Sequence, residues 1–127
     1  LGYASTRRAF GGALAELGMV QQHIADSEID IESARALIYR CAWQLDQQAT
    51  GPEAARLSSL TKVFAAEAVG RVVDRSVQIC GALGISEDLL LSRYLREVRA
   101  FRIYDGPSET HRWAVARRAV RQHREAS

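Results

Sequence analysis

The chain has 127 residues, of which 47% are hydrophobic and 25% charged, and its formal net charge is +2 at pH 7. This length suits one domain, and the apolar fraction is that of a globular protein, which excludes an intrinsically disordered chain. Two cysteines are too few for a disulfide scaffold, no apolar run approaches the roughly 18 residues of a membrane span, and the first residues show no secretory signal.

The segment from Gly18 to Gln48 is predicted to form one long helix. Its apolar residues recur at steps of three, four and seven residues, which places them along one helix face. They are Val20, Ile24, Ile31, Ala34, Ile38, Cys41 and Leu45. Charged residues such as Asp30 are expected on the opposite, solvent-exposed side. Gly51 suits a left-handed residue after a helix, and Pro52 suits the first turn of the next one.

A second helix is predicted from Pro52 to Cys80. Two apolar stripes run along it, and this wide apolar surface is typical of a helix packed at the centre of a bundle. One stripe contains Leu57, Leu60, Phe64, Ala68 and Val72, and the other contains Val63, Val69, Val73 and Val77.

Two further helices are expected after glycine-containing breaks. Gly81–Ile85 forms the first break, and Ser86 offers a capping hydroxyl for a third helix that runs to about Ile103. Tyr104–Ser108 forms the second break, before a fourth helix. Leu1–Ala9 resembles the end of another helix whose beginning is not present. Because no segment alternates long enough for a strand, the predicted fold is all-α, an antiparallel up-down four-helix bundle with long helices and short connections.

Metal and nucleic-acid sites are not expected. The histidines His23, His111 and His123 are scattered, and neither Cys41 nor Cys80 belongs to a Cys-x-x-Cys pair, so no zinc or haem spacing exists. No Glu-x-x-His pair indicates a di-iron bundle. The basic C-terminal third interleaves its arginines with acids and apolar residues, and its helices are too long for a helix-turn-helix.

The segment from Tyr104 to Glu109 is the most informative loop. It places the Asp105 carboxylate on a tight turn directly before a helix, and Gly106 permits unusual backbone angles and the close approach of a ligand. The backbone N–H groups at the start of the next helix attract an anion or a polarised carbonyl. An Asp-Gly-Pro turn by itself is common, so a purely structural turn is the alternative.

In four segments, the sequence resembles the C-terminal helical domain of the acyl-CoA dehydrogenase family. These are Arg7–Gly11, Ile24–Asp26 with Ala34–Arg35, Val77–Gly84, and Arg96–Arg112. They agree with the family in order and spacing across almost the whole chain. The sequence differs from the family at Ala82, which replaces a glycine, at Asp105, where many members have Glu, and at Pro107, where Thr is usual. The Asp-Gly-Pro turn is similar to one branch of the family, in which the Asp is taken to be the base.

The resemblance implies α,β-dehydrogenation of an acyl-CoA thioester. Asp105 would remove the α-proton as general base, the β-hydride would pass to N5 of FAD, and the N–H of Gly106 would bond the thioester carbonyl. Some members take the base from an earlier helix instead. Cofactor contacts are implied for Arg7 and Phe10 across a subunit interface, for Gln78 and Gly81 with the FAD of a neighbouring subunit, and for Ser108 and Glu109 at the active site. Each of these residues also has a purely structural interpretation.

The resemblance further implies that residues 1–127 form one domain of a larger enzyme and lack its N-terminal helical and middle β domains. Such a piece is expected to be inactive alone. The implied partners are an acyl-CoA substrate, an acceptor like electron-transfer flavoprotein, and further copies in a dimer or tetramer, in a bacterial cytoplasm or a mitochondrial matrix. Two alternatives stay open: an acyl-CoA oxidase-like flavoprotein domain, and a non-catalytic helical interaction module.

Overall fold

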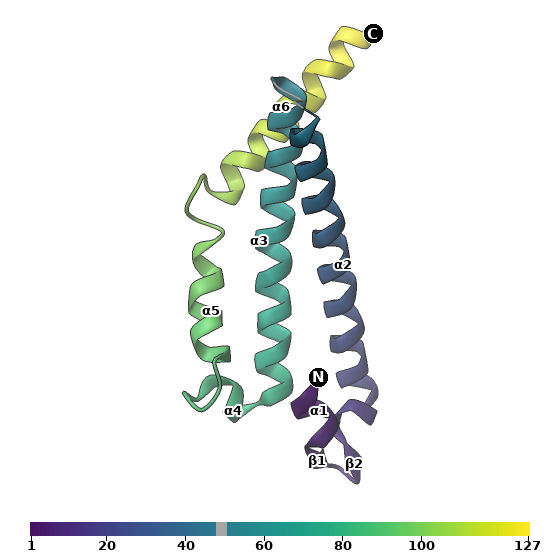
Figure 1. Ribbon diagram of the computed structural model, residues 1–127, viewed down its shortest axis with the longest axis vertical. Coiled ribbons are helices and arrows are strands. Elements are labelled where there is room, and N and C mark those ends of the chain that lie inside the picture. Colours follow the sequence, from purple (N-terminus) through teal and green to yellow (C-terminus); the bar gives the residue numbers. More distant parts are fainter. Residues whose placement is uncertain (48–50) are drawn as a thin grey trace.

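The computed structural model describes residues 1–47 and 51–127, and it is predominantly helical (Figure 1), which confirms the predicted all-α class. The elements are α1 (Gly2–Thr6), β1 (Arg8–Ala9), β2 (Gly12–Ala13), the 3₁₀ turn η1 (Leu14–Glu16), α2 (Gly18–Asp46), α3 (Pro52–Cys80), α4 (Ala82–Ile85), α5 (Leu91–Ala100) and α6 (Ser108–Ala126). The predicted second helix matches α3 at both ends. The predicted first helix matches α2 at its start, while its predicted end at Gln48 lies outside the described residues.

Helix α3 lies at the centre, with α2 on one side and α5 and α6 on the other (Figure 1). The chain runs up α2, down α3 and up α5, so the predicted alternation holds for these three helices. Helix α6 continues upward from the loop after α5 and crosses the start of α3, where the Arg118 side chain donates to the carbonyl of Pro52. Together α5 and α6 therefore cover the length of α3.

The predicted central role of the second helix is confirmed by its packing. Helix α3 contacts α1, α2, α4, α5 and α6. Most of the buried apolar side chains belong to it, and several are small, which lets the neighbouring helices approach closely. They are Ala54, Leu57, Ala66, Ala68 and Val73.

The N-terminal segment differs from its prediction. The expected helix end reaches only to Thr6, and a short antiparallel hairpin follows, in which Arg8 pairs with Ala13 and Ala9 with Gly12. Two-residue strands are too short for an alternating pattern to predict. The connecting residues, Phe10 and Gly11, have φ of 53° and 90°, as a two-residue turn with a left-handed conformation at both positions requires.

The third predicted helix also begins later than expected. The Ser86 hydroxyl accepts a hydrogen bond from the N–H of Asp88 at 3.2 Å, but this closes a local turn, and α5 starts only at Leu91. The predicted break at Gly81–Ile85 contains the single helical turn α4. Gly84 packs tightly there, because a Cβ at this position would lie 2.7 Å from the carbonyl oxygen of Val77.

Asp30 is buried, although its place among charged residues predicted exposure. Arg71 donates hydrogen bonds of 2.5 and 3.0 Å to its carboxylate, and Arg75 donates another of 2.7 Å. The hydrogen bonds from Arg71, supported by Arg75, outweigh burial and lower the pKa of Asp30 from 3.8 to about 2. The group therefore joins α2 to α3 through a paired, ionised carboxylate.

Because of this ion pair, the free energy of unfolding should depend on pH in the acidic range. The unfolded chain binds a proton at Asp30 at higher pH than the folded chain does, so the stabilisation is complete above pH 3.8 and is lost as the pH falls through about 2. We expect a contribution of about 2 kcal/mol to the free energy of unfolding. Urea unfolding of the wild-type chain and of Asp30→Asn over this range would measure it. The gap between the two should close in acid, and a constant gap would contradict the assignment.

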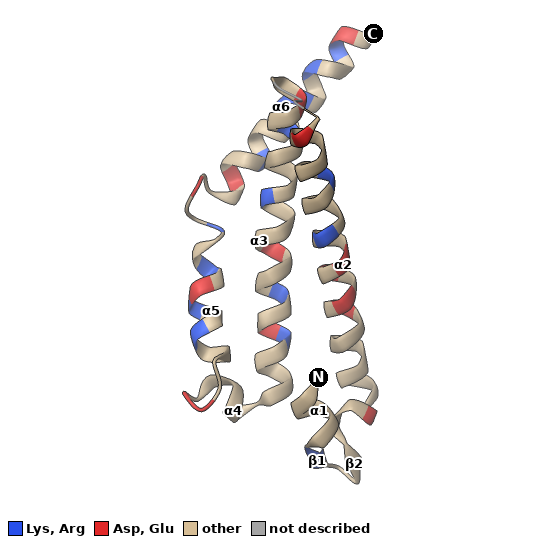
Figure 2. Ribbon diagram, viewed as in Figure 1, with Lys and Arg blue, Asp and Glu red and all other residues tan. Residues whose placement is uncertain are grey.

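Acidic and basic residues are mixed along α3, whereas α5 carries three arginines and one acid, Glu97 (Figure 2). Within residues 1–47 and 51–127, no helix is long and apolar enough to cross a membrane, and no cluster of three or more His, Cys, Asp or Glu side chains is placed to hold a metal ion.

Candidate active site

Asp105 lies on a strained turn between α5 and α6. Its φ is 53°, in the left-handed region that only glycine adopts without cost, and Gly106 follows with φ of 90°. An aspartate tolerates this conformation better than most residues, but the surroundings still have to stabilise it. The Asp105 side chain is exposed at the surface of the domain. The turn thus presents a carboxylate in a conformation that the loop alone would not favour.

Two side chains hold the backbone of this turn, and a third orients one of them. His111, in the first turns of α6, places Nε2 3.1 Å from the carbonyl oxygen of Asp105, and its Nδ1 lies 3.1 Å from the Ser59 hydroxyl on α3. Lys62, one turn further along α3, donates from Nζ to the carbonyl oxygen of Gly106 at 2.5 Å. The carbonyl groups of Asp105 and Gly106 are therefore both bonded to helical side chains.

Gly106 is required at its position for two reasons. Its φ of 90° lies in the region that favours glycine. A Cβ added there would also lie 2.7 Å from Nε2 of His111, closer than side chains normally approach. The imidazole ring therefore packs directly against the bare backbone of the turn.

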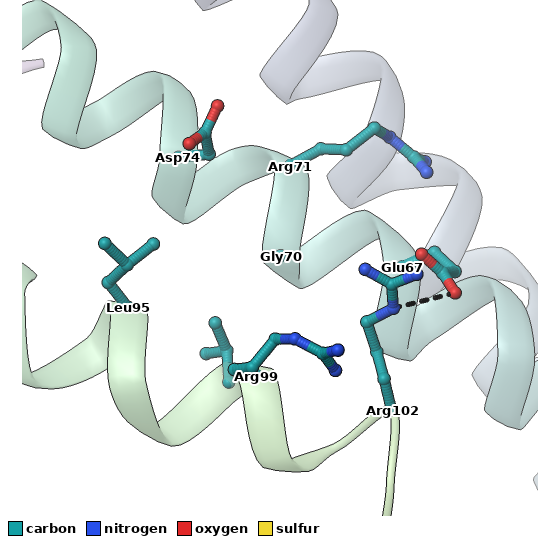
Figure 3. Close-up of a pocket in the computed structure, with 8 residues that line it drawn as sticks. Glu67, Gly70, Arg71, Asp74, Leu95, Arg99 and Arg102 are labelled. Carbon is teal, nitrogen blue, oxygen red and sulfur yellow. Dashed lines mark hydrogen bonds and ion pairs between the residues drawn. The ribbon is translucent and has the colours of Figure 1, made fainter. Parts of the chain in front are cut away.

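Glu67 on α3 anchors both ends of the loop. Its carboxylate accepts a hydrogen bond of 3.0 Å from Arg102, just after α5, and one of 3.1 Å from Arg112 on α6. Figure 3 shows the bond from Arg102, beside a cavity of about 300 Å³ between α3 and α5. Burial raises the pKa of Glu67, but the hydrogen bond from Arg112 and the charges of both arginines outweigh it, so this pKa lies below its ordinary value.

An apolar groove adjoins the turn. It lies between α2 and α3, has a volume of about 620 Å³, and reaches Phe101, Tyr104 and Asp105 at the loop. Most of its lining is apolar and includes Ile31, Ile38, Tyr39, Val69 and Val72. Asp105 and Lys62 are among the few charged groups on its rim. The predicted general base thus lies where apolar surface meets a polar loop.

The predicted cofactor residues fall into two groups. Phe10 stands at the tip of the hairpin with 91% of its surface exposed, and Arg7 precedes the hairpin. Gln78 and Gly81 are exposed at the C-terminal end of α3, at the same end of the molecule (Figure 1). The active-site group lies further up, where Glu109 is exposed at the start of α6 next to the Asp105 turn.

Ser108, at the start of α6, lies in the interior of the domain. It has no exposed surface. Its hydroxyl lies near the Glu67 carboxylate without a hydrogen bond of normal geometry, while its N–H donates to the carbonyl of Arg102 at 3.1 Å. Ser108 therefore supports the loop from within.

Sequence reasoning missed the four residues that hold the loop, namely Ser59, Lys62, Glu67 and His111. Ser59 and His111 are 52 residues apart in the chain, and Lys62 and Gly106 are 44 apart. The available signal was weak: polar residues interrupt the broad apolar surface of the second helix at a spacing that puts Ser59 and Lys62 on one face.

Comparisons with known proteins show the family of this chain. The sequence profile of the family described as "Acyl-CoA dehydrogenase, C-terminal domain" matches residues 1–120. The "Probable acyl-CoA dehydrogenase FadE2" of Mycobacterium tuberculosis is 44% identical over 111 residues, which cover 87% of this chain and 27% of that protein.

Two solved structures share the fold. One from Mycobacterium abscessus, assigned to the acyl-CoA dehydrogenases, superposes with a TM-score of 0.89 at 36% identity and covers 96% of this chain and 30% of its own. The FAD complex of PigA superposes with a TM-score of 0.86 at 25% identity, over 93% of this chain and 30% of its own. The chain thus spans less than a third of the length of these relatives. Its sequence and its fold together place it in the acyl-CoA dehydrogenase family, as a C-terminal domain of that family.

Proposed function

We propose that this chain is the C-terminal domain of an FAD-dependent dehydrogenase that introduces a double bond between the α and β carbons of an acyl-CoA thioester. The observation that carries the proposal is the Asp105 turn, an exposed carboxylate held in a strained conformation beside an apolar groove. Membership of the family supports it. N-terminal helical and middle β domains would complete the enzyme, in keeping with the share of its relatives that the chain spans.

In this proposal the chain supplies the base and part of the carbonyl site. Asp105 removes the α-proton of the thioester, and the N–H of Gly106 donates to the thioester carbonyl, so that negative charge developing on oxygen is stabilised as the proton leaves. Lys62 and His111 bond the carbonyl oxygens of Gly106 and Asp105. These bonds keep the Asp105 carboxylate and the Gly106 N–H in a fixed position relative to each other. FAD, when bound, supplies the acceptor for the β-hydride.

The exposed residues at the hairpin end fit one portion of a flavin dinucleotide. A bare aromatic ring at Phe10 suits stacking against a flat base, and the Arg7 guanidinium suits a phosphate group. Gly81 has φ of 59°, and a Cβ there would meet nothing within 4 Å, so the end of α3 is open to a ligand. Gln78 adds an exposed amide at that end. We propose FAD contacts for these residues and for Glu109.

The separation of the two groups supports an oligomer. Lys62, which contacts the Asp105 turn, and Gln78 lie about 24 Å apart along α3 at the rise of an α-helix. We propose that the hairpin end contacts the FAD of a neighbouring copy, whereas Asp105 and Glu109 act on the domain's own active site. A dimer or tetramer of the full-length protein would bring the two groups together.

The open groove supports a further element of the predicted bundle. Helix α1 lies between the lower ends of α2 and α3 (Figure 1), and an apolar groove continues between these helices. We propose that a helical segment of the full-length protein, of which α1 is the end, covers the part of this groove that lies away from Asp105 and completes an antiparallel bundle. The remaining partner that we propose is an electron acceptor like electron-transfer flavoprotein. The compartment that we propose is a bacterial cytoplasm, or the mitochondrial matrix in a eukaryote.

Phe10 offers a test of the cofactor contact. Its left-handed conformation costs a bulky residue about 1 kcal/mol, which an asparagine would avoid. We therefore expect Phe10→Asn to raise the free energy of unfolding of the chain by about that amount, and to weaken FAD binding by the full-length protein about tenfold. Urea unfolding and a flavin fluorescence titration measure the two effects. Phe10→Tyr keeps the ring and should bind FAD normally. Normal FAD affinity in Phe10→Asn would refute the contact.

The proposed function is tested on the full-length protein by its flavin absorbance spectrum and by dye-linked oxidation of acyl-CoA thioesters. The expected result is bound FAD and dye reduction that depends on the thioester. Peroxide formation with oxygen as the efficient acceptor would indicate an oxidase instead. Absence of bound flavin together with absence of acyl-CoA oxidation would indicate a non-catalytic helical module.

A further inference from the structure

We propose that His111 is a positioning residue, which holds Asp105 in the left-handed conformation that aims its carboxylate, and that Ser59 and Lys62 assist it. This inference rests on the proposed function, because it gives His111 a part in proton abstraction by Asp105. The juxtaposition that carries it is one imidazole ring bridging α3 and the Asp105 turn, with one nitrogen 3.1 Å from Ser59 Oγ and the other 3.1 Å from the Asp105 carbonyl oxygen.

The conformation of Asp105 needs an external support. A non-glycine residue at φ of 53° is less stable than in the usual regions, so an isolated loop would relax and turn the carboxylate elsewhere. The hydrogen bond to the Asp105 carbonyl opposes this relaxation, because it fixes the direction of the peptide that follows the Cα. The peptide is planar and trans, so its N–H, which belongs to Gly106, is turned away from His111.

The ring itself is held at both nitrogens. With the proton on Nε2, His111 donates to the Asp105 carbonyl, and Nδ1 accepts from the Ser59 hydroxyl. The missing side chain of Gly106 lets the ring lie against the turn, since a Cβ there would come within 2.7 Å of Nε2. Ser59 is half-buried on α3, so the ring is oriented by the helix that packs against α1, α2, α4, α5 and α6.

Lys62 restrains the next peptide. Its Nζ donates to the Gly106 carbonyl at 2.5 Å from a half-buried position on α3, three residues after Ser59. One face of α3 thus contacts the turn directly through Lys62, and indirectly through Ser59, which contacts His111. Two successive carbonyls are held, which leaves the Asp105 side chain as the part of the turn that faces outward. A shift of about 1 Å at a catalytic group can cost about a hundredfold in rate.

The experiment uses the full-length holoenzyme with His111→Leu, His111→Gln, Ser59→Ala and the matched control His123→Leu, an exposed histidine further along α6. Glutamine can keep an N–H donor close to the place of Nε2. Besides kcat and KM, α-proton exchange is measured by proton NMR in D₂O with phenylacetyl-CoA, which has α-hydrogens and no β-hydrogen. This exchange needs the base and no hydride transfer. Amide hydrogen exchange of residues 104–108 reports the order of the loop.

We expect His111→Leu to lower kcat and α-proton exchange about tenfold to a hundredfold, with KM changed by less than about threefold and faster amide exchange in the loop. His111→Gln should recover most of both rates, Ser59→Ala should lower them by less than His111→Leu does, and His123→Leu should match the wild type. Because Ser59→Ala is a small change, it keeps the test valid where His111→Leu folds poorly.

Wild-type rates in His111→Leu would overturn this inference and leave the proposed function standing. If His111→Leu does not fold, wild-type rates in Ser59→Ala would do the same. Equal losses in His111→Leu and His111→Gln would also overturn it. Absence of both acyl-CoA oxidation and α-proton exchange in the wild type would overturn the proposed function, and this inference with it.

Discussion

Asp105→Asn in the full-length protein is expected to lower kcat for acyl-CoA oxidation by about a thousandfold, the contribution of a general base whose proton acceptor has been removed. Asparagine has nearly the same shape as aspartate and tolerates the left-handed conformation found here, so the turn should persist. FAD content and acyl-CoA binding should change little, because only the proton acceptor is lost. Steady-state kinetics with a dye acceptor measure the effect.

Asp88→Asn is the matched control for this variant. Asp88 is an exposed carboxylate on the bend before α5, and its substitution should leave kcat within about twofold of the wild type. Near-normal kcat in Asp105→Asn would refute the base assignment. The base would then have to come from another part of the enzyme, as it does in family members that take it from an earlier helix.

Asp30→Ala is expected to lower the free energy of unfolding by about 3 kcal/mol, the largest stability effect of any single substitution proposed for this chain. The carboxylate is 11% exposed and carries the hydrogen bonds of two arginines, of which Arg75 is itself only 18% exposed. Removing the carboxylate leaves two positive charges together at the junction of α2 and α3. Urea unfolding followed by circular dichroism measures the loss.

Glu28→Ala provides the comparison for this variant. Glu28 lies on the same helix and is exposed, so its removal should change stability by no more than about 0.5 kcal/mol. Equal effects of Asp30→Ala and Glu28→Ala would show that the ion pairs of Asp30 contribute no more than an ordinary surface charge.

The sequence predicted the long helices well because their periodicity extends over many turns. Both ends of α3 follow from Pro52 and from the glycine after Cys80, and the two apolar stripes indicate its central place. The hairpin at Arg8–Ala13 escaped prediction because its strands have two residues each. Ser86 misled because a hydroxyl followed by acids is typical both of a helix start and of the local turn that it forms here.

The site could be predicted only in part, for a different reason. Asp105 and Gly106 stand next to each other and belong to a motif, so the sequence alone brings them together. Their supports come from α3 and α6, and no local pattern links a serine or lysine on one helix to a turn more than 40 residues away. Asp30 escaped for the same reason, because its arginine partners are 41 and 45 residues further along the chain.

The proposed dehydrogenation is tested most directly by the absorbance of the FAD bound to the full-length protein during anaerobic addition of acyl-CoA thioesters of several chain lengths. We expect at least one thioester to bleach the flavin absorbance and to yield an equal amount of its α,β-unsaturated product, and we expect Asp105→Asn to slow this bleaching about a thousandfold. A flavin spectrum that stays oxidised with every thioester would contradict the proposed function.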